Sequence, residues 1–179
     1  MNMKRHLRWI ALAIPAVALT IWTPVPDITG VSGQSLCEAN AKPANLNFVL
    51  KDMSGKDFNL ATQKGKVILL DFWATWCGPC MVEIPWFVEF QSKYGAKGLS
   101  VVGISVDDPV SKLKPFSDKM KVNYPFLVGD RRDDIKEKAF GPMWGLPVTF
   151  VIGRDGKICK KHVGLSSKDQ FEREIKSLL

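Results

Sequence analysis

The sequence predicts an α/β fold with a central mixed β-sheet flanked by helices. Three observations lead to this prediction. Short apolar runs of strand length alternate with helical segments through the middle of the chain, and a β-hairpin and an amphipathic helix follow at its end. Hydrophobic residues make up 46% of the chain, which is enough for a packed core. The length of 179 residues fits one domain behind a leader.

The leader has the pattern of an export signal. Basic residues open the chain and an apolar run, Trp9–Trp22, follows them. The run is short for a membrane span and no clear small-residue cleavage site follows it, so residues 1–30 are interpreted as either a signal peptide or an uncleaved membrane anchor. Residues 31–44 are rich in Gly, Ser, Pro and Ala and are predicted to be a linker, which leaves 45–179 for the folded domain.

The first half of this domain is predicted to contain a small hairpin, a buried strand and a long helix. The hairpin strands are Leu46–Leu50 and Asp57–Leu60, joined by a turn that contains Gly55. The buried strand is the apolar run Val67–Phe72, and the helix after it runs from Gly78 to Tyr94.

The second half is predicted to contain four strands and three helical segments. Its expected elements, in chain order, are a buried parallel strand Leu99–Val106, a helix Pro109–Met120, a short strand Tyr124–Leu127, a helical turn Arg131–Ala139, a hairpin of Val148–Ile152 and Lys157–Val163, and an amphipathic helix Ser167–Leu179.

Two cysteines separated by Gly78 and Pro79 lie where the buried strand ends and the long helix begins. The first turn of a helix has unpaired N–H groups and a partial positive charge, which favour a thiolate over a thiol. Cys77, at the very start of the helix, is therefore expected to be the thiolate, and Cys80 lies one turn further on. This arrangement predicts thiol–disulfide exchange in which Cys77 attacks and Cys80 resolves the mixed disulfide. Zinc binding would need two further ligands, and no second C-x-x-C or paired histidines are present, so no metal site is expected.

The stretch from Asp71 to Cys80 reads DFWATWCGPC and resembles the active-site segment of the thioredoxin superfamily. The rest of the chain, from about Asn45 to Leu179, is similar to the membrane-attached TlpA/ResA-type branch, which is found outside the bacterial cytoplasm. The resemblance implies a thioredoxin fold, with the N-terminal hairpin of that branch and a strand–helix unit inserted between Cys80 and Pro147. It also places the domain in the bacterial periplasm or on the outer face of the cytoplasmic membrane, where disulfides form.

Two acidic residues are candidates for proton transfer. Asp71 lies inside the apolar strand, where desolvation raises the pKa of a carboxyl group, and it matches the buried acid of thioredoxin. Glu83 lies one helical turn after Cys80 and matches the acid of the TlpA/ResA branch. Asp71 is favoured as the proton acceptor, and a solvent-facing Glu83 and a merely hydrogen-bonded Asp71 are the alternatives.

The resemblance also implies a substrate-binding surface around the cysteines. Pro147, after Leu146, is expected to be a cis proline that faces the cysteines and pairs with an extended substrate segment. Trp76 is expected to be a surface platform for partners, beside Gly78 and Pro79. A Gly-Pro insert implies a reductant of low potential.

The sequence therefore predicts a protein-disulfide reductase without a cofactor, acting as a monomer. The resemblance suggests a membrane thiol donor of electrons and substrates such as apocytochrome c or a copper-site protein. The net charge is +7, but the basic residues of the domain are scattered, which argues against nucleic-acid binding.

Two other functions and one pair of residues stay open. A copper-binding protein would need a third ligand, and no histidine is close to the motif in sequence. A peroxiredoxin would need a threonine three residues and a proline seven residues before its cysteine, where this chain has Ala74 and Leu70. Cys37 and Cys159 are either free thiols or a second disulfide, and their spacing does not decide between these states.

Overall fold

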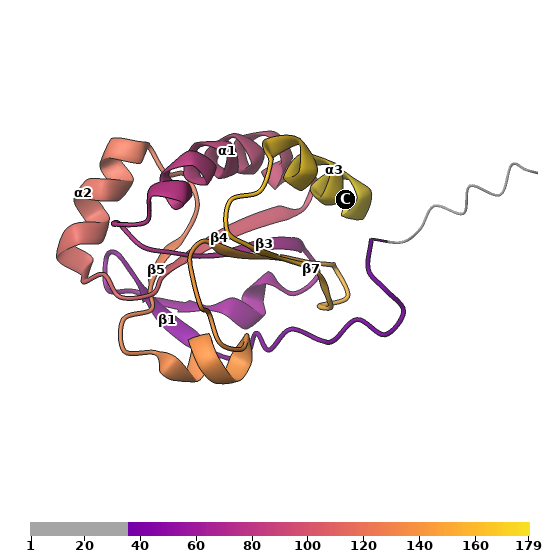
Figure 1. Cartoon of the computed structure of the whole chain (residues 1–179), viewed down its shortest axis with the longest axis horizontal. Coiled ribbons are helices and arrows are strands. Elements are labelled where there is room, and N and C mark those ends of the chain that lie inside the picture. Colours follow the sequence, from indigo (N-terminus) through magenta and orange to yellow (C-terminus); the bar gives the residue numbers. More distant parts are fainter. Residues whose placement is uncertain (1–35) are drawn as a thin grey trace, which may run out of the picture. The chain divides into compact units, whose positions relative to one another are not determined.

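The computed structural model describes residues 36–179, so the predicted leader and the first part of the linker lie outside the described residues. In this range seven strands form one sheet, in the order β2-β1-β5-β4-β3-β6-β7 (Figure 1). The strands are β1 (Val49–Asp52), β2 (Asp57–Asn59), β3 (Val67–Trp73), β4 (Leu99–Ser105), β5 (Phe126–Val128), β6 (Val148–Ile152) and β7 (Ile158–Val163).

The sheet is mixed, as predicted. The central strands β3, β4 and β5 are parallel to one another. The C-terminal hairpin of β6 and β7 is antiparallel and pairs through β6 with β3. The N-terminal hairpin of β1 and β2 is added at the opposite edge, where β1 runs antiparallel to β5. The parallel strands β3 and β4 therefore end at the same edge of the sheet, and the loops that follow them lie close together.

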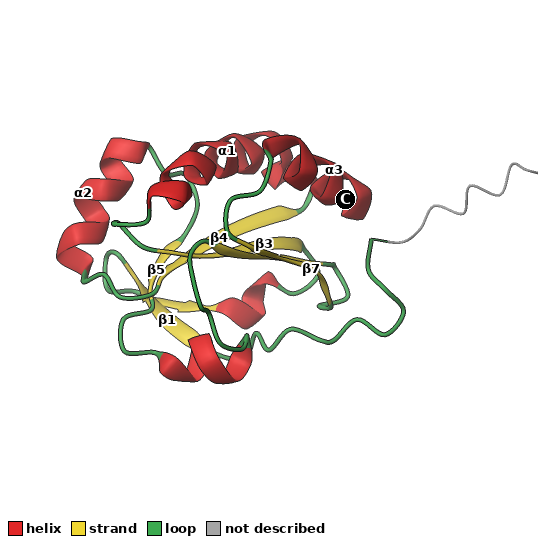
Figure 2. Cartoon of the chain, in the orientation of Figure 1, coloured by secondary structure: helices red, strands yellow, loops and turns green. Residues whose placement is uncertain are grey.

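Helices cover both faces of the sheet (Figures 1 and 2). The longer helices α1 (Gly78–Tyr94), α2 (Val110–Met120) and α3 (Lys168–Leu178) lie on one face. The 3-10 turn η1 (Leu60–Gln63) and the π-helical segment η3 (Asp134–Ala139) lie on the other, and a short 3-10 turn η2 (Gly95–Lys97) ends α1.

Two apolar cores follow from the alternation of side chains along β3. Val67, Leu69 and Trp73 pack into the core under the long helices, whereas the residues between them pack into the core of the opposite face. Successive side chains of a strand point to opposite faces, so Asp71 shares the face of Leu69 and Trp73. The only charged residue of β3 is therefore directed toward the helices that carry the cysteine pair.

Some predicted boundaries are wrong. The first strand begins at Val49 rather than Leu46, and β5 begins at Phe126 rather than Tyr124. In both cases a buried side chain precedes the sheet ladder: Leu46 and Tyr124 contribute to the core without belonging to a strand. Burial extends an apolar pattern beyond the residues whose backbones pair, which explains both errors.

Residues 36–44, predicted as the end of the linker, are attached to the hairpin of β6 and β7. Cys37 forms a disulfide with Cys159, 122 residues later in the sequence. Two backbone hydrogen bonds add to this attachment: Ala44 N–H donates to the Gly156 carbonyl (2.8 Å) and Ile158 N–H donates to the Lys42 carbonyl (2.9 Å). The alternative of two free thiols is therefore wrong for this structure. Among the helices of residues 36–179, none combines the length and the apolar character that crossing a membrane requires.

Candidate active site

The cysteine pair lies at the junction of β3 and α1, as predicted. Cys77 is the N-cap of α1 and Pro79 lies in its first turn, where the missing proline N–H costs nothing. Cys77 and Cys80 form a disulfide, with their Cα atoms 5.3 Å apart. The Cys80 N–H points at the Cys77 sulfur, 3.2 Å away. A backbone N–H and the positive end of a helix thus both act on Cys77, and each favours a negative charge on its sulfur.

The loop before Cys77 is held by Asp108, which the sequence analysis did not identify. The Asp108 carboxylate accepts hydrogen bonds from the Thr75 N–H (2.7 Å), the Thr75 hydroxyl (2.5 Å) and the Ser105 hydroxyl (2.8 Å). Its side chain is buried, with 1% of the residue exposed. Because Ser105 ends β4 and Thr75 follows β3, this carboxylate joins the ends of two parallel strands beside the disulfide. The only indication of this role in the sequence is that Asp107 and Asp108 form an acidic pair directly after an apolar strand.

Asp71 is buried under the helices. It pairs in the sheet with Gly103 on β4 and with Thr149 on β6. The Thr149 hydroxyl donates a hydrogen bond to Oδ1 (3.2 Å), whereas Oδ2 accepts none from residues 36–179. Desolvation by burial, with the nearby charge of Glu83, raises the pKa of Asp71 well above its ordinary value.

Glu83 is fully buried, with 0% of the residue exposed, so the solvent-facing alternative is wrong. The backbone N–H of Ser166, in the loop between β7 and α3, donates a hydrogen bond of 2.9 Å to its Oε1. Its Oε2 accepts no hydrogen bond from the described part of the chain. Burial raises the pKa of Glu83 to about 7, against the lowering effect of the Ser166 N–H.

The two acids and the cysteines share one face of the sheet. Glu83 lies one turn after Cys80, so both side chains are on the same side of α1. Asp71 is on the strand below, where burial and then the charge of Glu83 raise the pKa of its carboxyl group. The geometry thus brings together the four residues that the sequence singled out for chemistry.

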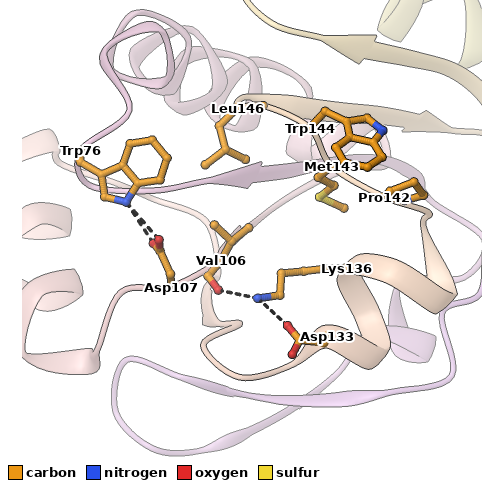
Figure 3. A pocket seen from close by; sticks show the side chains of 10 residues that line it. Trp76, Val106, Asp107, Asp133, Lys136, Pro142, Met143, Trp144 and Leu146 are labelled. Carbon is orange, nitrogen blue, oxygen red and sulfur yellow. Dashed lines mark hydrogen bonds and ion pairs between the residues drawn. The ribbon is translucent and has the colours of Figure 1, made fainter.

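A groove of about 420 Å³ is lined by Trp76, the residue before Cys77, and by residues of the loop before β6 (Figure 3). Trp76 forms one wall and is 65% exposed; its indole N–H is held by Asp107 at 3.2 Å. Leu146 and Trp144 come from the loop before β6, and Trp144 is 93% exposed. The bond between Leu146 and Pro147 is cis. The remaining lining residues are Val106, Asp107, Asp133, Lys136, Pro142, Met143 and Gly145. Gly78 and Pro79 do not line the groove; they begin α1 beside Trp76.

Residues 36–179 contain no group of three or more His, Cys, Asp or Glu side chains arranged to hold a metal ion. His162, for which the sequence suggested no role, lies 2.8 Å from Glu174 of α3 through its Nε2 atom.

Comparison with known proteins agrees with this geometry. The model of the AhpC/TSA family matches residues 41–161. The thiol-disulfide oxidoreductase ResA of Bacillus thuringiensis (strain Al Hakam) is 33% identical over 132 residues, which is 74% of this chain and 75% of that protein. The chain belongs to the ResA-type thiol-disulfide oxidoreductases of the AhpC/TSA family. The same name is carried by a protein of Halalkalibacterium halodurans that is 27% identical over 169 residues, 94% of this chain and 93% of its own length.

The fold of this ResA-type chain matches solved structures. A thiol:disulfide interchange protein of the thioredoxin family from Chlorobium tepidum TLS superposes with a TM-score of 0.70 at 31% identity, covering 79% of this chain and 99% of that one. The predicted thioredoxin fold is therefore confirmed. So are the thiol–disulfide oxidoreductase function and the protein-disulfide reductase activity, which act on disulfide-containing substrates; the copper-binding and peroxidase alternatives are not favoured.

Proposed function

We propose that the ResA-type chain reduces disulfides in exported proteins, with Cys77 as the nucleophile and Cys80 as the resolving thiol. The observation that carries this assignment is the position of Cys77 as the N-cap of α1, with the Cys80 N–H 3.2 Å from its sulfur. These groups stabilise a negative charge on the Cys77 sulfur, which favours Cys77 as the sulfur that attacks the substrate.

The reaction consists of two exchanges. The Cys77 thiolate attacks one sulfur of the substrate disulfide, and the other substrate sulfur leaves as a thiolate. Cys80 then loses its proton and attacks the Cys77 sulfur, which releases the second substrate thiolate and forms the Cys77–Cys80 disulfide. Two electrons pass to the substrate, and a membrane thiol donor returns the enzyme to the dithiol.

Glu83 and Asp71 serve the second exchange as a coupled pair. Cys80 is buried, so its proton needs an acceptor inside the protein. Glu83 ionises first, because the Ser166 N–H stabilises its carboxylate and its pKa lies near 7. Asp71 keeps its own proton at that point, since the charge of Glu83 opposes a second charge nearby. The sequence alone favoured Asp71; the hydrogen bond from Ser166 supports Glu83 as the first acceptor.

The groove between Trp76 and Leu146 is the proposed binding surface for the substrate. An extended segment that carries the disulfide would lie along Leu146 and Pro147, over Gly78 and Pro79. Candidate substrates are apocytochrome c and a copper-site protein. The exposed indole of Trp76 supplies an apolar contact area at this surface.

We also propose that the protein is exported, that it carries a single N-terminal anchor or signal, and that it is a monomer. The leader of basic and apolar residues supports export. The Cys37–Cys159 disulfide adds support, because structural disulfides are rare in reducing compartments. An alkaline-phosphatase fusion after Leu179 should be active in intact cells, and an inactive fusion would place the domain in the cytoplasm.

Trapping of the mixed disulfide tests the chemistry. The Cys80→Ala variant should accumulate a covalent complex between Cys77 and its substrate, which mass spectrometry identifies. Cys77→Ser should form no complex and should reduce no disulfide. A complex linked through Cys80 in the Cys77→Ser variant, together with alkylation of Cys80 before Cys77 at mildly acidic pH, would reverse the assignment.

A further inference from the structure

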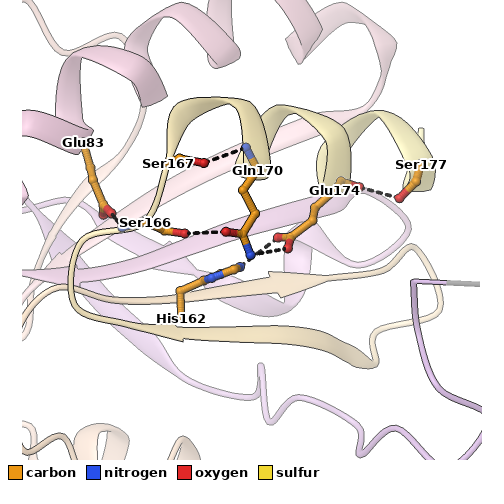
Figure 4. A network of polar contacts seen from close by, with 7 residues as sticks. All are labelled: Glu83, His162, Ser166, Ser167, Gln170, Glu174 and Ser177. Atoms are coloured by element: carbon orange, nitrogen blue, oxygen red, sulfur yellow. Dashed lines mark hydrogen bonds and ion pairs between the residues drawn. The ribbon is translucent and has the colours of Figure 1, made fainter.

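Polar side chains of α3 and β7 form a network that is connected to Glu83 through Ser166 (Figure 4). It begins at Ser166, whose N–H donates to Glu83, and it continues through the side chains of Gln170, Glu174 and His162. None of the hydrogen bonds that the last three residues make in residues 36–179 is to a cysteine, and neither the motif nor the proposed reaction explains why they are linked to the buried acid.

We infer that Gln170 is a positioning residue for Glu83, which it controls by fixing the N–H of Ser166. The Ser166 hydroxyl donates a hydrogen bond of 3.1 Å to Oε1 of Gln170. The backbone N–H of Gln170 in turn donates a hydrogen bond of 3.2 Å to the hydroxyl of Ser167, which is the N-cap of α3. Two consecutive loop residues, Ser166 and Ser167, are therefore bound to Gln170, and this fixes the orientation of Ser166 together with its backbone N–H.

Gln170 is itself held on its other side. Its amide nitrogen donates to Oε1 of Glu174 (3.3 Å), and Oε2 of Glu174 lies 2.8 Å from Nε2 of His162. The His162 ring packs edge-on against Phe171, with the ring centres 4.8 Å apart. The network is thus anchored in both α3 and β7, which are rigid elements, while the loop it holds has no regular structure of its own.

The consequence for Glu83 follows from its burial. Ser166 supplies the one hydrogen bond that Glu83 accepts from residues 36–179, so this N–H is the main group that stabilises its carboxylate against desolvation. A hydrogen bond to the charged form of an acid lowers its pKa. When Gln170 no longer holds the loop, the N–H loses its fixed direction, and Glu83 retains its proton to higher pH.

The charged and titratable groups around Glu83 come from every element packed near it. They are Asp71 on β3, Cys77 and Cys80 on α1, Tyr124 before β5, His162 on β7, Glu174 on α3, and the ion pair of Lys168 with Glu89 between α3 and α1. In the oxidised enzyme the two cysteines do not titrate, so the carboxyl titration of Glu83 can be followed without them.

The test is a carbon-13 NMR titration of the Glu83 carboxyl group in the oxidised full-length protein. Gln170→Met keeps the length of the side chain and removes the hydrogen bonds of its amide group to Ser166 and Glu174, and it should raise the pKa of Glu83 by about one unit. Arg173→Met is the matched control, because Arg173 is an exposed residue of the same helix outside the network, and it should leave that pKa unchanged. An unchanged pKa in Gln170→Met, with or without a loss of stability, would overturn the inference.

Variants of Ser166 provide an independent measurement. Ser166→Ala removes the hydroxyl but keeps the N–H, so it should shift the pKa of Glu83 in the same direction, whereas Ser166→Thr should preserve it. Because one hydrogen bond joins the two side chains, the double variant should shift the pKa no further than the larger single shift. Additive shifts would show that the two residues act separately and would contradict the proposed link.

The inference rests on the proposed role of Glu83 as the base, but different experimental results would refute the role of Glu83 and the role of Gln170. In stopped-flow resolution of the mixed disulfide, Gln170→Met should move the pH midpoint upward by the same amount and slow the step up to about tenfold below that midpoint. If Glu83→Gln leaves the pH profile of the native enzyme unchanged, the role of Glu83 as base is wrong. If Glu83→Gln removes the profile but Gln170→Met moves neither the profile nor the NMR titration, only the positioning role is wrong.

Discussion

Thr75 donates two hydrogen bonds to Asp108, one from its hydroxyl at 2.5 Å and one from its backbone N–H at 2.7 Å. The two residues are 33 positions apart, and Thr75 stands two residues before Cys77. With its third bond, from Ser105, the carboxylate fixes the backbone that presents the nucleophile. The loop that carries the chemistry is therefore held by a charged group outside the motif.

Asp108→Ala should lower the free energy of unfolding by about 3 kcal/mol, because hydrogen bonds to a buried charged group contribute about 1.5–3 kcal/mol and their donors would be left unpaired. Asp108→Asn keeps an acceptor oxygen and should cost less. Both variants should slow disulfide reduction, since the loop before Cys77 loses its support. Urea denaturation and an insulin reduction assay measure the two effects. Asp107→Asn is the control: the Asp107 side chain accepts a hydrogen bond from the exposed Trp76, and a stability loss as large as that of Asp108→Ala would refute the assignment.

Much of the fold could be predicted because its signals are local. The apolar run of β3, the cysteine motif and the amphipathic pattern of α3 gave these elements within a residue or two. The boundaries of β1 and β5 could not be predicted, because Leu46 and Tyr124 are buried by contacts outside the sheet.

The candidate site likewise has a part that local sequence patterns predict and a part that depends on distant residues. Cys77, Cys80, Asp71 and Glu83 are recognisable from the motif and its spacing. The groups that set their properties are not, because each comes from a distant part of the chain. The donor to Glu83 is a backbone N–H 83 residues later, which has no sequence signature at all. The role of Asp108 depends on the parallel strands β3 and β4 ending side by side, which no local pattern around Asp108 indicates.

The Cys37–Cys159 disulfide should stabilise the domain without affecting its activity. It closes a span of 122 residues, for which the loss of chain entropy in the unfolded state predicts a stabilisation of about 5 kcal/mol. The bond lies near Gly153, at the end of the β6–β7 hairpin away from Pro147. Cys37→Ala/Cys159→Ala should therefore unfold at lower urea concentration and reduce disulfides at the native rate. A loss of activity in the folded variant would show that this bond participates in the redox cycle.

Stability should fall as the pH rises through the range in which Glu83 titrates. Below its ordinary pKa of 4.5 the carboxyl group is protonated in both the folded and the unfolded chain. Above it the unfolded chain releases the proton, while the folded protein retains it until about pH 7. The free energy of unfolding therefore falls by about 1.4 kcal/mol per pH unit over this window, a total of about 3 kcal/mol.

Glu83→Gln should remove this component, so that the variant loses less stability between pH 4.5 and 7 than the native protein does. Urea denaturation of the oxidised proteins at several pH values measures the difference. Glu89→Gln, a substitution of the same kind on the exposed side of α1, should leave the native pH dependence in place. Identical pH dependences for Glu83→Gln and the native protein would mean that Glu83 is not protonated on folding.

The variants Glu83→Gln and Asp71→Asn distinguish which of the two buried acids accepts the proton of Cys80. If Glu83 is the first acceptor, Glu83→Gln should slow the resolving step about a hundredfold at pH 7, the lower end of what a general base contributes. Asp71→Asn should change the rate at pH 7 only a few-fold, because asparagine replaces a carboxyl group that is already neutral while Glu83 carries the charge. It should also remove the charge interaction between the two groups, so that the pH profile keeps the inflection near 7 and loses any inflection above it.

Stopped-flow measurement of substrate release from the preformed mixed disulfide, across pH, gives both profiles. Asp71→Asn should be at least as stable as the native protein, since it removes a buried group that is costly to ionise. A large loss of rate in Asp71→Asn with a small one in Glu83→Gln would return the role to Asp71, as the sequence alone favoured. The Ser166 N–H would then stabilise a charge that is not used in the reaction, and the network behind it would be a feature of folding rather than of catalysis.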